Sequence, residues 1–194
     1  MREDIADSLI HFTKANSELD AYSVLRKILR EQLLIGSNNK IRSGDNCVCF
    51  SEVPVDSLKG GFTNSSGYSQ YSRFGIVFPK NWIFEIGGRP VIYQSESEYK
   101  FLTEENKWRH MRLDLSEDKF VDFTWEREWR VKIESLSFSC EFVSIVLPNK
   151  NWEERFIADM NEESWWFAYS WTIALDDDAW WYDTGNPWHT VTPK

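Results

Sequence analysis

The stretch FTWEREWRV, residues 123–131, indicates what kind of sheet this chain can form. Bulky apolar and charged side chains alternate along it, which is typical of a β-strand. Residues two apart on a strand share a face, so Glu126 and Glu128 are expected side by side. Arg130 is expected on their face, and Arg127 on the opposite one. Two carboxylates in register between tryptophans indicate either a salt-bridged sheet or the floor of a binding site.

The composition favours one globular domain. A chain of 194 residues is long enough for one well-buried domain and short for two, so we expect a single domain over residues 1–194. The apolar fraction is 42%, and eleven tryptophans supply much of a large core. A net charge of −9 disfavours nonspecific binding to nucleic acid through phosphate contacts.

Cysteine usage and hydropathy predict a cytoplasmic location with no membrane. Cys47, Cys49 and Cys140 are an odd set without a paired framework, which is typical of reduced thiols. The N-terminus lacks the apolar core of a signal peptide, and no run approaches the ~20 residues of a membrane span.

Strand and helix patterns follow one another along the chain. The order of these patterns predicts an α+β fold with a mixed or antiparallel sheet and flanking helices. Ser17 and Asp20 form a capping box at the start of the first helix. The glycine- and serine-rich segment 59–72 is expected to be a mobile loop near a site. Strands are expected at 8–14, 47–53, 141–148 and in two runs within 74–94, and helices at 16–34, 96–115 and 151–164.

Several familiar kinds of site are missing from the sequence. It contains no glycine-rich phosphate loop and no nucleophile elbow. The histidines, His11, His110 and His189, show no metal-ligand spacing. What remains is a polar set expected near strand ends: His11, Thr13, Tyr71, Tyr93, and the pair Glu126 and Glu128.

Six segments in order resemble the AbiGi family of abortive phage resistance proteins. The resemblance covers about residues 10–148 and suggests a distant branch of the ADP-ribosyltransferase-like fold, which includes the DarT toxins and the diphtheria-toxin type of enzyme. That fold has a split β-sheet, and the resemblance implies NAD as substrate and an unknown protein or nucleic acid as acceptor of ADP-ribose. The segments are IHFTK, LRKIL, CVCFSEVP, YSRFGIVF, GRPVIY and WEREWRV.

The resemblance also implies roles for individual residues. His11 matches a histidine that contacts NAD from the first strand, with Thr13 beside it, and Glu128 matches the catalytic glutamate. Tyr71 and Tyr93 are both candidates for an aromatic ring that stacks on nicotinamide.

In such an enzyme, a carboxylate facing the oxocarbenium-like transition state stabilises it selectively. Glu128 would serve this purpose and hold the ribose, while Glu126 would orient the acceptor. Both roles require His11 and Glu128 to face one pocket and not opposite faces of the sheet.

Other interpretations stay open. Glu126 and Glu128 can pair with arginines or lysines of the sheet, and the tyrosines can be packing residues. The whole domain can also be a catalytically silent, antitoxin-like protein that neutralises a toxin partner. An acidic, aromatic surface suits capture of a basic protein. A nuclease is the weakest alternative, because no acidic metal-binding constellation has a recognisable spacing.

Overall fold

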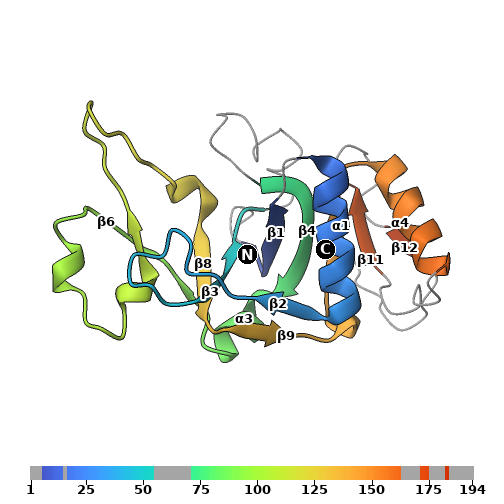
Figure 1. Cartoon of the computed structure of the whole chain (residues 1–194), viewed down its shortest axis with the longest axis horizontal. Helices are drawn as coiled ribbons and strands as arrows, with labels where there is room; N and C mark the ends of the chain where they lie inside the picture. The colour runs from blue at the N-terminus through green and yellow to red at the C-terminus, as the bar shows by residue number, and fades with distance from the viewer. Residues whose placement is uncertain (1–5, 15–16, 55–70, 163–170, 175–181, 184–194) are drawn as a thin grey trace.

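A large sheet organises the chain (Figure 1). The computed structural model describes residues 6–14, 17–54, 71–162, 171–174 and 182–183. Within them, eight strands form one sheet in the order β12-β11-β10-β4-β1-β3-β8-β5, and every neighbouring pair is antiparallel except β10 with β11. The strands are β1 (Ser8–Lys14), β3 (Cys47–Ser51), β4 (Tyr71–Pro79), β5 (Arg89–Pro90), β8 (Glu128–Lys132), β10 (Ser144–Leu147), β11 (Trp171–Ala174) and β12 (Tyr182–Asp183). The expected α+β domain with a mostly antiparallel sheet is confirmed.

The first helix begins at the predicted cap. α1 (Glu18–Glu31) has Ser17 as N-cap, whose hydroxyl accepts a hydrogen bond from the amide of Asp20. It ends earlier than the apolar pattern suggested, because Gln32 adopts the left-handed conformation at φ 49°. Leu33 then opens the short strand β2 (Leu33–Ile35), which pairs with β9 (Ser135–Ser137).

The core lies between α1 and one face of the sheet. α1 packs on β1 and β4, and its buried residues include Tyr22 and Leu25. They meet apolar side chains of β4, of which Phe74 and Phe78 are fully buried. The last helix, α4 (Lys150–Glu162), joins this core through Phe156 and confirms the helix expected there.

Of two predictions for the middle of the chain, one holds in part and one is wrong. The first strand run expected within 74–94 is β4, but the helix α3 (Lys80–Glu85) follows it, and the second run contains only two short strands. Residues 96–115 do not form a helix. Side chains there bond to nearby backbone and side chains in place of helical bonds, as Ser95 and Glu98 do at 2.6 Å. The segment contains η1 (Tyr99–Phe101), η2 (Lys107–Arg109) and β7 (His110–Arg112), which pairs in parallel with β6 (Ile92–Gln94).

The sheet opens between β1 and β3. The two strands share one pair of partners, Ile10 opposite Ser51. On its other edge, β1 pairs with β4 along almost its whole length. The strands β1 and β3 therefore separate towards Lys14, and this opening creates the space for a site.

The remaining segments frame the sheet. Residues 91–122 project to the left of Figure 1 as an arm that contains β6. Two further turns are η3 (Thr124–Glu126) and η4 (Cys140–Phe142). Among the described residues, no helix combines the length and the apolar character required to span a bilayer.

Candidate functional site

A cavity of about 460 Å³ lies where the sheet opens. Its size falls within the range of small-molecule sites, roughly 300–1,000 Å³. One wall comes from β1, through residues 11–14, and the other from β3, through residues 47–49. α1, the loop after β2, Met111 and Phe123 complete the walls, together with Glu126, Glu128 and Arg130.

The cavity brings His11 and Glu128 together despite the strand register. Ile10 lies opposite Ser51, and Ser51 lies opposite Glu128, so these three residues share one face of the sheet. His11, the next residue on β1, therefore lies on the other face, and its ring packs against Phe50 with the ring centres 5.9 Å apart. The expectation that His11 and Glu128 do not lie on opposite faces of the sheet is not met by the register. Both residues nevertheless line the cavity where β1 and β3 part.

Glu126 is not on the strand, so this part of the prediction is wrong. It ends the turn η3, and Arg127 follows in the left-handed conformation at φ 44° before β8 begins with Glu128. The turn is held to β3, where the hydroxyl of Ser51 donates to the carbonyl of Glu126 at 2.7 Å. Both glutamates nevertheless line the cavity and are 8% and 5% exposed, respectively.

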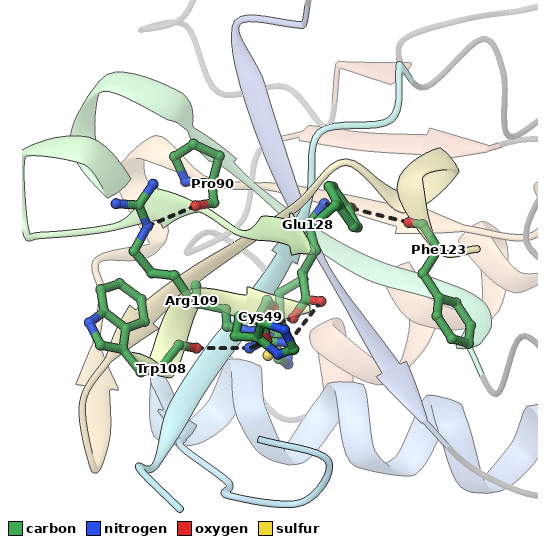
Figure 2. A network of polar contacts seen from close by, with 10 residues as sticks. Cys49, Pro90, Trp108, Arg109, Phe123 and Glu128 are labelled. Atoms are coloured by element: carbon green, nitrogen blue, oxygen red, sulfur yellow. Dashed lines mark hydrogen bonds and ion pairs between the residues drawn. The ribbon is translucent and has the colours of Figure 1, made fainter. Parts of the chain in front are cut away.

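Arg130 holds the carboxylate of Glu128, which Figure 2 labels, through two hydrogen bonds. Its Nε and Nη2 donate to the two carboxylate oxygens of Glu128 at 2.8 and 3.2 Å. Its Nη1 donates to the carbonyls of Trp108 and His110 at 2.8 and 2.9 Å. The Arg130 side chain is 1% exposed, so the pair is buried. The ion pair that the sequence allowed for Glu128 exists, and it faces the cavity.

Tyr93 fixes the acidic turn and is not among the residues that line the cavity. Its hydroxyl donates to the carbonyl of Phe123 and accepts from the amide of Glu128, both at 3.1 Å. Burial raises the pKa of Tyr93 to about 12, so it stays protonated. The hydroxyl thus bridges the two ends of the turn that carries Glu126. The structure does not place the Tyr93 ring where it could stack on a ligand in the cavity.

Replacing Tyr93 by phenylalanine is expected to lower the free energy of unfolding by about 1–3 kcal/mol, because a buried carbonyl and amide lose their partner. Equilibrium unfolding in urea measures this change. Tyr99→Phe is the matched control, since the Tyr99 ring packs against His110 and Arg42 and its hydroxyl has no hydrogen-bond partner among the described residues. Equal losses in both variants would show that the hydroxyl of Tyr93 does not hold the turn.

His11 lines the cavity as a neutral imidazole. Its Nδ1 lies 2.8 Å from the carbonyl of Cys49, which can only accept, so Nδ1 carries the proton. Burial lowers the pKa of His11 to about 4. Nε2 is then unprotonated at neutral pH and can accept a hydrogen bond from a ligand. Thr13 is buried beside it, with its hydroxyl 2.7 Å from that of Ser72.

The imidazole of His11 is expected to remain neutral on acidification until about pH 4. The folded pKa lies below the unfolded value of about 6.5, so the unfolded chain binds the proton first. Stability from this site is therefore fully present above about pH 6.5 and is lost as the pH falls towards 4. An NMR titration of the His11 ring measures its pKa directly. A midpoint near 6.5 would contradict a ring that is kept neutral by its surroundings.

The structure describes the backbone of Tyr71 but not the segment before it. Tyr71 opens β4, and its backbone lies opposite Lys14. Its side chain lies outside the described residues, as does segment 55–70. The predicted mobile loop therefore falls almost entirely outside the part of the chain that the structure describes.

The cysteines are free thiols, as predicted. Cys47 and Cys49 line the cavity. Burial raises the pKa of Cys47 to about 11. The pKa of Cys49 is also raised, first by burial and then by the charge of Glu128 (Figure 2). Both thiols stay protonated at neutral pH, so neither is a ready nucleophile.

Some residues of the cavity gave no signal in the sequence. Lys40 and Asn39 lie in a segment that reads as an ordinary exposed loop, yet both line the cavity. Within the described residues, no three or more His, Cys, Asp or Glu side chains are arranged to hold a metal ion. Comparison with protein-family models, with curated proteins and with solved structures finds no match to this chain.

Proposed function

We propose that the cavity binds NAD and that the protein cleaves the bond between nicotinamide and ribose, passing ADP-ribose to an acceptor or to water. One observation carries the proposal: the cavity gathers His11 and Thr13 from β1 with Glu126 and Glu128 from a segment more than a hundred positions later. A concave site that collects polar groups from distant segments is the usual form of an active site.

The floor of the cavity offers hydrogen-bond acceptors. Nε2 of His11 and the carboxylate oxygens of Glu126 and Glu128 can all accept hydrogen bonds. Such a floor suits a ligand rich in donors, as the vicinal hydroxyls of a ribose are. Each carboxylate oxygen of Glu128 accepts one hydrogen bond from Arg130. A carboxylate oxygen has a second lone pair, which could accept a hydrogen bond from a ribose hydroxyl.

The same carboxylates suit the chemistry of bond cleavage. Nicotinamide leaves neutral with the electron pair of the C1′–N bond, and positive charge develops on the ribose. Glu128, already oriented by Arg130, would stabilise that charge without reorganisation. Glu126 would orient the nucleophile, which adds at C1′ and loses a proton. With water as nucleophile, the products are ADP-ribose, nicotinamide and one proton.

Sequence and fold both support the family assignment within this proposal. The segments that resemble AbiGi supply β1, β3 and β8, whose residues line the cavity, and β4, which pairs with β1. The opening of the sheet between β1 and β3 agrees with the split sheet of an ADP-ribosyltransferase-like fold. We infer a role in phage defence, with the protein acting as the toxin.

Nicotinamide release tests the proposed function. The purified protein is incubated with NAD, with and without cell extract, and nicotinamide is quantified by chromatography. Label from the ADP-ribose portion appears on protein or nucleic acid if transfer occurs, and as free ADP-ribose if water is the acceptor. Absence of both turnover and NAD binding would overturn the proposal.

A second candidate function is neutralisation of a toxin partner by direct binding. It is favoured by an exposed hairpin on the arm, in which Asp114 and Val121 exchange backbone hydrogen bonds of 2.9 and 2.6 Å. The next residues outward, Leu115 and Phe120, are 62% and 69% exposed. Exposed apolar side chains grouped in this way mark interaction surfaces.

The second function predicts a different set of results. Replacing Leu115 and Phe120 by serine should abolish co-purification of the neutralised protein, while Phe101→Ser on the same arm should preserve it. Nicotinamide release by the isolated wild-type protein would count against a purely neutralising role.

A further inference from the structure

The rim of the cavity differs in chemistry from its floor. The floor residues Glu126 and Glu128 are buried, and they accept hydrogen bonds. The rim is formed in part by the exposed residues Lys14, Asn39 and Lys40, whose ammonium and amide groups donate hydrogen bonds. One cavity therefore combines a donor-rich, cationic entrance with an acceptor-rich, acidic floor.

The loop that carries Lys40 is firmly built. Ser37 and Cys47 exchange backbone hydrogen bonds of 2.9 and 3.1 Å, which close the base of the loop. Within it, the amide of Ile41 donates to the carbonyl of Asn38 at 3.0 Å. The backbone around Lys40 is thus held in a hydrogen-bonded turn.

Arg42 ties this loop to the arm. Its guanidinium lies 3.8 Å from the centre of the Tyr99 ring and forms an ion pair with Glu96 at 2.5 Å. Arg42 is therefore engaged by the arm, whereas Lys40 of the same loop lines the cavity.

Lys40 itself adopts an unusual conformation. Its φ of 63° lies in the left-handed region, which residues other than glycine, asparagine and aspartate seldom occupy. Such conformations persist where the surrounding structure holds them, and they cluster at functional sites. Within the described part of the chain, no carboxylate pairs with the Lys40 ammonium.

We propose that Lys40, together with Asn39 and Lys14, which line the same cavity, forms a subsite for the phosphoryl groups of the ligand. The pyrophosphate of a dinucleotide would lie at this rim while its ribose reaches Glu126 and Glu128 on the floor. The identification of the phosphoryl groups as the pyrophosphate of NAD rests on the proposed function. The prediction that the cavity binds some phosphorylated ligand does not depend on it. In a protein with a net charge of −9, cations at the entrance also counteract the general repulsion of an anionic ligand.

Binding of matched ligands tests the subsite without requiring turnover. Calorimetry compares ADP-ribose, inorganic pyrophosphate and nicotinamide riboside on the wild type and on Lys40→Ala. Loss of Lys40 is expected to weaken ADP-ribose binding about tenfold, as for one charge-assisted hydrogen bond. Binding of nicotinamide riboside, which has no phosphate, should not weaken. Lys40→Arg should retain most of the affinity for ADP-ribose. The control is Lys119→Ala, because Lys119 is an exposed lysine of the arm that does not line the cavity.

Each result decides the proposal. Equal weakening of ADP-ribose and the riboside would mean that Lys40 only shapes the loop, and unchanged ADP-ribose affinity in Lys40→Ala would exclude its contact with phosphate. A wild-type protein that binds neither ADP-ribose nor pyrophosphate also overturns the subsite. Lys40-dependent binding of ADP-ribose without nicotinamide release would overturn the proposed catalysis alone. Nicotinamide release that is insensitive to Lys40 would overturn the subsite alone.

Discussion

Replacing Glu128 by glutamine is expected to slow nicotinamide release by about two to three orders of magnitude, because it removes a preorganised charge where positive charge develops. Glutamine keeps the shape of the side chain and can still accept one hydrogen bond. The substitution also leaves the buried Arg130 without its counter-charge, so the variant should be less stable. Turnover must therefore be measured at a temperature at which circular dichroism shows the variant to be folded.

A double variant separates catalysis from stability. Glu128→Gln combined with Arg130→Met removes both buried charges, and such replacements are often neutral for stability. If Glu128 acts on the substrate, the double variant should be more stable than Arg130→Met alone, because no unpaired carboxylate is buried, and it should remain inactive. Recovery of activity together with stability would show that Glu128 matters only as the partner of Arg130.

The single substitution Arg130→Met is expected to cause the largest loss of stability, about 3–5 kcal/mol, because it leaves the Glu128 carboxylate buried and unpaired. The carbonyls of Trp108 and His110 would lose their donor as well. A loss of this size is a large part of the ~5–15 kcal/mol that stabilises a typical domain. Urea unfolding followed by tryptophan fluorescence measures it.

Arg112→Met is the matched control for Arg130→Met. Arg112 pairs with Asp114 at 2.7 Å, but its side chain is 39% exposed. Exposed pairs contribute about 0–1 kcal/mol, so this variant should remain close to the wild type. Similar losses in the two variants would show that burial does not strengthen the Glu128–Arg130 pair.

Elements with a strong local cause could be predicted from the sequence. The cap at Ser17 acts through a side chain three residues from its partner, and it starts α1 where expected. The alternation in CVCFSEV produces β3. His11, Glu126 and Glu128 were also singled out as candidates, because polar residue types are unusual beside apolar strand patterns. These signals are local, so a single sequence contains them.

The turn at Glu126 could not be predicted in the same way. Alternation in FTWEREWRV suggests one continuous strand, whereas η3 and the left-handed Arg127 interrupt it. The interruption is held by Tyr93 and by Ser51, which lie more than 30 and 70 positions away. Long-range hydrogen bonds of this kind override the local pattern.

By itself, the sequence determined the α+β class, the main strands and the residue types that can form an acidic site, because propensity and periodicity act between near neighbours. The tertiary structure decided the rest. The separation of β1 from β3 creates the cavity, and the reach of Arg130 to Trp108 and His110 fixes Glu128 within it. The loop closure that places Lys40 at the rim likewise depends on pairing between Ser37 and Cys47. Each of these features arises from contacts between segments far apart in the chain, for which the local pattern contains no signal.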